Sequence, residues 1–199
     1  MKEIFSGILL AGGKSERMGV DKRYLEYDGR TFLDIAVERL KSVADEVIAV
    51  TAEGENIEFD GVISVSDIAS DRGPMMGIYT GLKTMAGPRG IVNPVDTPGL
   101  RTELLEYMKD VSGGFDVLMP VWKGYPEPLI AVYSRKVIPV IERFFEEGRK
   151  PAPHLLADEG SGLRVRLLAE DEISRFGDPE LMFRNVNTPE DLKIERTRL

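Results

Sequence analysis

The chain of 199 residues contains no cysteine, which excludes disulfides, thiolate zinc sites, iron–sulfur clusters and cysteine nucleophiles. It contains one histidine, His154, which follows Pro151 and Pro153 where no nearby residue pairs with it. We therefore interpret His154 as a partly exposed loop residue. A Ser-His-Asp arrangement has no other histidine on which it could be built.

Positive charge is also scarce, because 26 Lys and Arg stand against 34 Asp and Glu and give a formal net charge of −8. Such a balance argues against nucleic acid and anionic membranes as partners, although a local basic patch can still hold a small anion. The first apolar run ends at Gly12, far short of the roughly 20 residues of a membrane span, and has no signal cleavage site. We expect a cytoplasmic protein.

Short apolar runs alternate with amphipathic segments along the chain. Strands are predicted at 4–10, 47–50, 62–65, 91–95, 115–120 and 129–133. Helices are predicted after a cap at Thr31, from Pro74 to Ala86, after a cap at Thr102, from Ser134 to Glu147, and after Thr188. This alternation predicts a single three-layer α/β/α domain over residues 1–199, with a mostly parallel sheet and helices on both faces.

The first of these helices has a clear apolar face. Its apolar residues fall at three- and four-residue spacings, and Arg39 falls at the same spacing as Phe32, Ala36, Leu40 and Val43. The less regular segments at 69–73, 122–128 and 148–162 are predicted to be loops. In open α/β sheets, ligands bind among the loops at the carboxyl ends of the strands.

A glycine-rich loop, LAGGKSERMGVDK at residues 10–22, follows the first predicted strand. Paired glycines expose backbone N–H groups that suit a phosphate, and Arg17 and Lys22 can neutralise a polyphosphate. A Walker P-loop is excluded by register, because Ile8 stands where its first glycine belongs. The dinucleotide spacing Gly-x-Gly-x-x-Gly is also absent. A plain glycine turn with solvated charges remains the alternative, but it does not account for Arg17 and Lys22 in one loop.

Asp96 directly follows an apolar strand and is followed by Pro98. A carboxylate at the carboxyl end of a strand is well placed to hold a Mg²⁺ that bridges nucleotide phosphates. From position alone, a turn or helix-capping aspartate is an equally good interpretation.

Five segments together resemble a known family. The 10–22 loop resembles the signature of nucleotidyltransferases of the sugar-nucleotide pyrophosphorylase type, and its form is similar to that of the molybdenum cofactor guanylyltransferases. The segments at 72–78, 93–98, 125–129 and 185–192 resemble further motifs of that family in the same order. The resemblance spans nearly the whole chain and implies the Rossmann-like fold of the nucleotide-diphospho-sugar transferases. Val95 departs from the cysteine often found before the family's aspartate, and Val50 and Thr51 stand where some members have an asparagine.

The resemblance implies roles for particular residues. Arg17, Lys22 and Asp96 would be catalytic, and Asp96 would bind the metal. Nucleotide binding would fall to Leu10, Ala11, Gly12, Gly13, Lys22, Asp67 and Asp96. Asp67 would accept hydrogen bonds from the base edge of guanine, with Asp71 as a competitor for this role. Asn185 and Asn187 would line the acceptor site, although an Asx turn before the Thr188 cap explains them equally well.

The implied reaction transfers GMP from GTP to the phosphate of molybdopterin, or of its molybdenum-loaded form, with Mg²⁺ as cofactor. The product would be molybdopterin guanine dinucleotide, and molybdoenzymes or other cofactor-assembly proteins are possible partners. Three alternatives stay open at this point. They are the same chemistry with CTP, transfer to another phosphorylated acceptor such as a cobinamide phosphate, and a nucleotide-binding delivery factor without turnover.

Overall fold

The computed structural model describes residues 3–12, 21–69, 73–147 and 151–186. Its strands are β1 (Phe5–Leu10), β2 (Glu26–Tyr27), β3 (Arg30–Thr31), β4 (Glu46–Thr51), β5 (Val62–Ser66), β6 (Arg89–Pro94), β7 (Val117–Trp122), β8 (Tyr125–Pro126), β9 (Ala131–Ser134) and β10 (Val165–Leu168). Its α-helices are α1 (Phe32–Val43), α2 (Pro74–Thr84), α3 (Thr102–Val111), α4 (Ile138–Glu146), α5 (Glu170–Ile173) and α6 (Pro179–Met182). Short 3₁₀ turns are η1 (Lys22–Tyr24), η2 (Arg135–Val137), η3 (Pro153–Ala157) and η4 (Glu159–Ser161).

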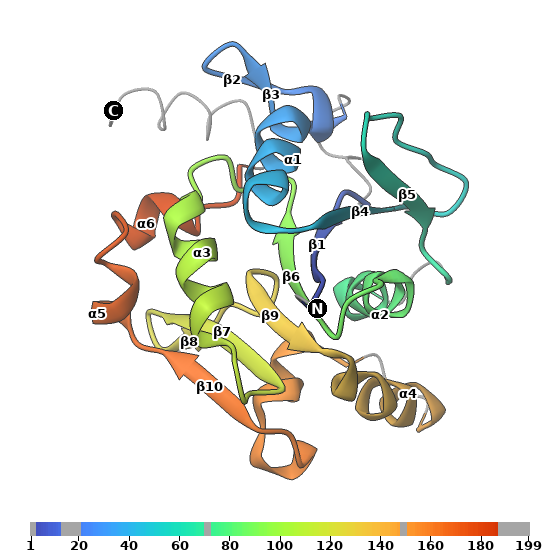
Figure 1. Ribbon diagram of the computed structural model, residues 1–199, viewed down its shortest axis with the longest axis vertical. Coiled ribbons are helices and arrows are strands. Elements are labelled where there is room, and N and C mark those ends of the chain that lie inside the picture. Colours follow the sequence, from blue (N-terminus) through green and yellow to red (C-terminus); the bar gives the residue numbers. More distant parts are fainter. Residues whose placement is uncertain (1–2, 13–20, 70–72, 148–150, 187–199) are drawn as a thin grey trace.

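A mostly parallel sheet forms the centre of the molecule, with the strand order β10-β7-β9-β6-β1-β4-β5 (Figure 1). β1 pairs in parallel with both β4 and β6, and β4 pairs in parallel with β5. Only β9 runs against this direction within that path, since it is antiparallel to β6 and β7. The chain leaves β1 for β4 and β5 on one side and returns to β6 on the other, so the topological switch point lies between β1 and β6.

Two hydrophobic clusters cover the two faces of the sheet. Side chains alternate along β4, where Val47 and Ala49 join one cluster and Ile48 and Val50 join the other. Helices α1, α3, α5 and α6 contribute to the first cluster, and α2 and α4 contribute to the second. The predicted three-layer arrangement, with a mostly parallel sheet between helices, is therefore confirmed.

The predicted start of α1 is confirmed in detail. The Thr31 side chain accepts a hydrogen bond from the Asp34 backbone N–H, and the Asp34 side chain accepts from the Thr31 N–H. This reciprocal capping box satisfies two N–H groups that the helix itself leaves unpaired. The predicted strands at 4–10, 47–50, 62–65 and 91–95 and the helix from Pro74 also occur, with ends shifted by one or two residues.

Other predicted boundaries were wrong. Thr102 lies inside α3, and the residue before it, Arg101, takes the cap position without a side-chain hydrogen bond. The helix expected directly after Ser134 begins as the 3₁₀ turn η2 and becomes α-helical only at Ile138. Pro139 explains this break, because it has no N–H to donate to the carbonyl four residues earlier. The helix expected after Thr188 lies outside the described residues.

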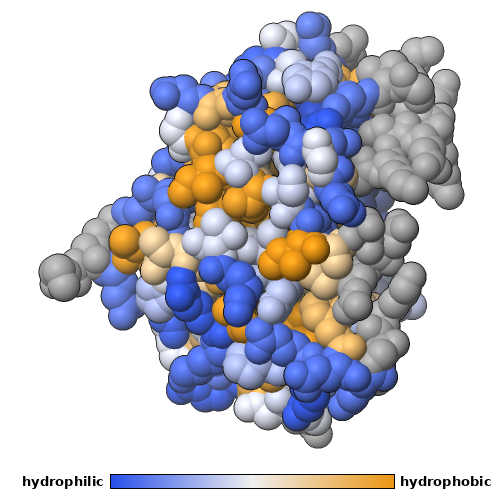
Figure 2. Space-filling model, turned by 90° about the vertical axis from the view of Figure 1, so that its right-hand side faces the viewer, coloured by the Kyte–Doolittle hydropathy of each residue, from blue (hydrophilic) through white to orange (hydrophobic). Residues whose placement is uncertain are grey.

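Figure 2 views the molecule from the side that carries the edge strand β5, and hydrophobic residues there are interspersed with hydrophilic ones. Among large hydrophobic side chains, Ile63 of β5 and Ile68 beyond it are 47% and 61% exposed. Across the described ranges, no helix has the length and apolar composition needed to cross a bilayer.

Gly81 lies where α2 packs tightly against β1. A Cβ atom at this position would lie 2.4 Å from Cγ2 of Ile8, a fully buried side chain of β1. We expect Gly81→Ala to destabilise the fold by about 1 kcal/mol or more, because overpacking costs roughly 1–3 kcal/mol and exceeds the gain in helix propensity. Urea denaturation of this variant measures the effect. Gly113→Ala is the control, since a Cβ at Gly113 meets no atom within 4 Å. Equal midpoints for the two variants would contradict the prediction.

Candidate functional site

The carboxyl ends of β1, β4, β5 and β6 are joined by backbone hydrogen bonds beyond the strands themselves. The Ala11 N–H donates to the carbonyl of Val50 at 2.9 Å, and the Val95 N–H donates to the carbonyl of Leu10 at 3.1 Å. The start of the glycine-rich loop is thus held between the end of β4 and the end of β6. This is the edge at the topological switch point, where open α/β sheets bind ligands.

Gly12 fits this position because it has no side chain. A Cβ at Gly12 would lie 3.0 Å from the backbone N of Ala52 and 3.1 Å from the carbonyl carbon of Thr51. Backbone atoms cannot move aside as a flexible side chain can, so a larger residue would push the loop away from β4. The exposed backbone of Gly12 is therefore fixed directly beside the end of a neighbouring strand.

Lys22 and Asp96 meet at this edge although they lie far apart in the sequence. The Lys22 Nζ lies 3.5 Å from Oδ2 of Asp96, and the two side chains are 24% and 21% exposed. An ammonium and a carboxylate in a partly desolvated crevice can bind complementary groups on one ligand, such as an anion and its counter-cation. The structure thus brings together two of the residues that sequence motifs singled out.

A second group of charges fixes the turn that carries Lys22. Asp21 caps η1 by accepting a hydrogen bond from the Arg23 N–H at 3.0 Å, and Arg23 also pairs with Glu55 at 2.8 Å. Burial opposes ionisation of Asp21, but hydrogen bonds and the charge of Arg23 lower the pKa of this carboxyl below its usual value. The aspartate of the Asp21-Lys22 pair therefore has a structural part in holding the lysine.

Asp67 lies one residue beyond β5, and its N–H donates to the carbonyl of Thr51 at 2.9 Å. Its Oδ1 accepts hydrogen bonds from the Thr80 hydroxyl at 2.7 Å and from the Ile68 N–H at 3.0 Å. Burial raises the pKa of Asp67, and those two hydrogen bonds oppose the rise. Among the described residues none donates to Oδ2, so one oxygen of a half-buried carboxylate is left for a ligand.

The Asp96 backbone is tied to the end of the described chain. Its carbonyl accepts a hydrogen bond from the Val186 N–H at 2.9 Å, and Val186 is fully buried. Asn185, the neighbour of Val186, is exposed. The predicted acceptor residue Asn185 is therefore brought next to the Asp96 loop from the far end of the sequence.

Arg39 of α1 contacts the same loop, and sequence motifs gave it no role. Its side chain is only 6% exposed, and it donates hydrogen bonds to the carbonyls of Thr97 and Pro98 and to Oδ1 of Asn93. One sequence signal could have identified it. An arginine at the spacing of an apolar helix face must bury a charge, and a buried charge requires partners.

The turn between β7 and β9 was also predicted to be a loop, and it contains the short strand β8. Lys123 in this turn pairs with Glu180 of α6 and lies over the ring of Trp122. Burial raises the pKa of the Glu127 carboxyl, which follows β8. The Glu127 N–H donates to the carbonyl of Pro120 at 2.9 Å, so the Glu127 backbone lies beside the second half of β7.

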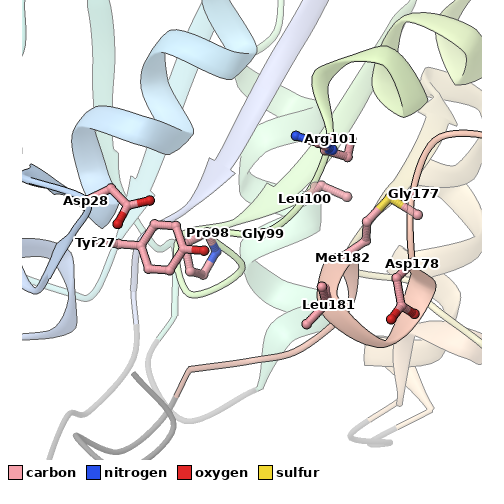
Figure 3. Close-up of a pocket in the computed structure, with 10 residues that line it drawn as sticks. All are labelled: Tyr27, Asp28, Pro98, Gly99, Leu100, Arg101, Gly177, Asp178, Leu181 and Met182. Carbon is pink, nitrogen blue, oxygen red and sulfur yellow. The ribbon is translucent and has the colours of Figure 1, made fainter. Parts of the chain in front are cut away.

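A cavity of about 270 Å³ adjoins the Asp96 loop (Figure 3). Tyr27 and Asp28 line it from the β2–β3 side, and residues 98–101 form a second wall. The third wall is formed by Gly177, Asp178, Leu181 and Met182. Its lining is mostly apolar with carboxylates and one arginine at its margin. The wall formed by residues 98–101 begins two residues after Asp96, so the loop that carries Asp96 also forms one side of this cavity.

Several predicted residues lie outside the described ranges. These are Gly13, Arg17, Asp71 and Asn187. His154 is exposed, which agrees with its interpretation as a partly exposed residue, but it lies in the 3₁₀ turn η3 and not in an irregular loop. Within the described residues, no group of three or more His, Asp or Glu could by itself hold a metal ion.

Comparison with known families places this edge of the sheet in context. The sequence model described as "MobA-like NTP transferase domain" matches residues 7–162. The chain belongs to this family. A molybdenum cofactor guanylyltransferase of Desulfosudis oleivorans is 34% identical over 194 residues, covering 94% of this chain and 92% of the relative. A probable molybdenum cofactor guanylyltransferase of Pelotomaculum thermopropionicum is 35% identical, covering 94% and 89%.

Solved structures agree with the fold. A crystal structure named molybdopterin-guanine dinucleotide biosynthesis protein A from Archaeoglobus fulgidus has a TM-score of 0.78 at 23% identity and covers 98% of both chains. A 2-C-methyl-D-erythritol 4-phosphate cytidylyltransferase from Thermus thermophilus has a TM-score of 0.73 at 15% identity. The predicted nucleotidyltransferase fold and the resemblance to MobA-like transferases are therefore confirmed.

Proposed function

We propose that this MobA-like transferase is a Mg²⁺-dependent guanylyltransferase that transfers GMP from GTP to the phosphate of molybdopterin. The observation that carries the proposal is the Lys22–Asp96 pair at the switch point between β1 and β6. Near-full-length identity above 30% to relatives named molybdenum cofactor guanylyltransferase supports the same substrates.

The reaction needs positioned charges rather than a proton acceptor. A phosphate oxygen of the acceptor forms a bond to the α-phosphorus of GTP, and the bond from that phosphorus to the oxygen bridging to the β-phosphate breaks, so that pyrophosphate leaves. The second pKa of a phosphomonoester is about 6, so the acceptor phosphate is mostly dianionic at neutral pH. The chain has no cysteine, and its one histidine, His154, is not among the residues of the candidate site. This composition is consistent with a reaction that needs no proton acceptor.

Lys22 binds the phosphates and offsets the negative charge that grows on the leaving pyrophosphate. Arg17 is proposed to assist it from the same loop. Fixed positive charge of this kind is the main contribution that a protein makes to transfer at phosphorus. The backbones of Leu10, Ala11, Gly12 and Gly13 are proposed to contact the nucleotide.

Asp96 is the residue proposed to hold Mg²⁺. Protein sites for Mg²⁺ commonly supply one or two carboxylates, and substrate phosphates and water complete the shell. A single partly exposed carboxylate beside a lysine fits this pattern, although the described residues include no ready-made metal cluster. When bound, Mg²⁺ would neutralise phosphate charge and polarise the α-phosphate.

The residues proposed to contact the base and the acceptor come from different parts of the chain. Asp67 is proposed to accept from the N1–H and the amino group of guanine through its unoccupied oxygen. Asn185, together with Asn187, is proposed to contact the acceptor, since Asn185 lies beside the Asp96 loop.

Pyrophosphate release is the direct test of the proposed function. The wild-type protein would be assayed with Mg²⁺ and with GTP, CTP or ATP, each in the presence and absence of molybdopterin. We expect release only with GTP and molybdopterin together. Release with CTP instead would keep the mechanism and overturn the role of Asp67. Tight binding of GTP without release would favour another acceptor or a delivery role.

A further inference from the structure

The loop that carries Asp96 is short. It connects the end of β6 at Pro94 with the start of α3 at Thr102, and within it Pro98 has no N–H group. On one side of Asp96, the Val95 N–H reaches Leu10 of β1, and the Asp96 carbonyl accepts from Val186. These two bonds fix the backbone up to Asp96. Beyond it, the Thr97 carbonyl accepts a local hydrogen bond from the Leu100 N–H at 3.3 Å, and among the described residues no backbone N–H of another element reaches the Thr97 or Pro98 carbonyl.

Arg39 supplies those partners. Its NH1 group lies 3.1 Å from the Thr97 carbonyl oxygen, and its NH2 group lies 2.8 Å from the Pro98 carbonyl oxygen. A third bond of 3.3 Å runs from NH1 to Oδ1 of Asn93 on β6. One planar guanidinium therefore joins Asn93, near the end of β6, to the two residues that follow Asp96.

The charge of Arg39 has no anionic partner among the described residues. Burial lowers the pKa of Arg39 to about 10, and the nearby charge of Arg30 contributes to the decrease. The side chain nevertheless remains protonated at neutral pH. A buried cation that is matched only by carbonyl and amide oxygens is expensive for the fold, and well-packed apolar residues often replace buried charges without loss of stability. Stability alone therefore gives little reason to keep an arginine here.

We infer that Arg39 is a positioning residue for Asp96. It holds the Thr97 and Pro98 carbonyls against α1, and this fixes the carboxylate of Asp96 beside Lys22 at the edge of the sheet. Arg39 does not touch the nucleotide or the acceptor, because it is buried in the helix layer. The inference rests on the proposed function only in treating Asp96 as the carboxylate that holds the metal.

The chemistry of arginine and its place on α1 both suit it to position this loop. Its fork donates in two directions at once, whereas a lysine ammonium is a point charge without that geometry. Arg39 belongs to α1, whose first turn is fixed by a capping box, so its hydrogen bonds hold the loop in place relative to this helix. Small displacements of positioned groups are costly, since an error of about 1 Å can reduce a rate about 10²-fold.

The test compares Arg39→Met and Arg39→Lys with Arg30→Met. Methionine fills an apolar site and removes the buried charge, so the variant is expected to fold, and lysine keeps the charge but loses the fork. Arg30 is an exposed residue that pairs with Glu38, and its substitution removes a nearby charge without changing the loop. Circular dichroism would first establish that each variant is folded at the assay temperature.

The first readout is Mn²⁺ binding in the presence of GTP, followed by electron paramagnetic resonance. We expect Arg39→Met to weaken the affinity for Mn²⁺ about 10- to 100-fold, which is the usual effect of removing a residue that orients a metal ligand. Arg39→Lys should have an intermediate affinity, and Arg30→Met should bind Mn²⁺ as the wild type does. In an Asp96→Asn background, Arg39→Met should add no further loss. An effect that adds fully to that of Asp96→Asn would assign Arg39 to general core stability and overturn the inference.

The second readout needs neither nucleotide nor metal. Lysines would be labelled by reductive methylation with ¹³C, and the Lys22 signal would be assigned by its loss in Lys22→Arg. Asp96→Asn removes the negative charge that lies 3.5 Å from the Lys22 Nζ, so we expect it to shift this signal, and we expect Arg39→Met to shift it in the same direction. A Lys22 signal unchanged by Arg39→Met would overturn the inference, even if the protein proved to use another nucleotide. Failure of GTP to bind the wild-type protein would instead contradict the proposed function alone.

Discussion

Asp96→Asn is expected to reduce pyrophosphate release by at least about 10²-fold while the protein remains folded. Asparagine keeps the size of the side chain and one oxygen, but it loses the negative charge that attracts both Mg²⁺ and Lys22. Because the ion pair is about one-quarter exposed, its loss should change the free energy of unfolding by no more than about 1 kcal/mol. Steady-state kinetics over a range of Mg²⁺ concentrations, with thermal melting of the same samples, would check both parts.

The matched control for this substitution is Asp110→Asn. Asp110 is an exposed aspartate of α3, so its variant makes the same change of charge away from the sheet edge. We expect wild-type kinetics from it. If Asp96→Asn kept near-normal turnover and an unchanged Mg²⁺ dependence, the assignment of the metal to Asp96 would be wrong. Restoration of the lost activity by higher Mg²⁺ would support weakened metal binding as the cause.

The sequence was sufficient to predict most of the elements that carry the site. Periodicity located β1, β4, β5 and β6, because each is a short apolar run between turns, and capping chemistry located the start of α1. Short elements were missed, including the β2–β3 hairpin, β8 and β10. Two-residue strands are too short for a periodic pattern, and β10 is partly exposed on one edge of the sheet.

For the candidate site as well, some features could be predicted from the sequence and others could not. Lys22, Asp67 and Asp96 were predicted because they stand in motifs or directly after strands, and each lies at the carboxyl edge of the sheet. The tertiary partners of these residues were not predictable. The contact of Arg39 with the Asp96 loop joins residues 58 positions apart, and that of Val186 with Asp96 joins the end of the described chain to the loop after β6. Such contacts depend on how the layers pack, which spacing along the chain does not encode.

Asp67→Asn is expected to lower the preference for GTP over CTP about 10- to 100-fold, since the loss of a specific contact to a base edge is worth roughly 1–3 kcal/mol. The reason lies in the different surroundings of the two carboxylate oxygens. Oδ1 accepts from Thr80 and Ile68, so an asparagine is expected to keep its oxygen there and to turn its NH₂ group towards the ligand. That donor would then face the N1–H and amino donors of guanine. Competition between GTP and CTP in the pyrophosphate assay measures the change.

The same residue predicts a pH dependence. Because burial raises the pKa of Asp67, its carboxyl becomes protonated at a higher pH than an ordinary aspartate does on acidification. The protonated acid loses acceptor capacity, so the preference for GTP should decline at mildly acidic pH. The contribution of Asp67 to the free energy of unfolding should change in the opposite direction. A pKa that is raised in the folded state stabilises the fold at acidic pH, and this contribution is lost as the pH rises through the folded-state pKa.

Asp67→Asn should abolish both pH effects because asparagine does not titrate. Asp60→Asn, at an exposed position before β5, should leave both unchanged. A GTP preference that falls with acidification equally in the wild type and in Asp67→Asn would move the titrating group elsewhere, for instance to the phosphates themselves. A preference that Asp67→Asn does not alter at any pH would transfer the recognition of guanine from Asp67 to another residue of the same edge.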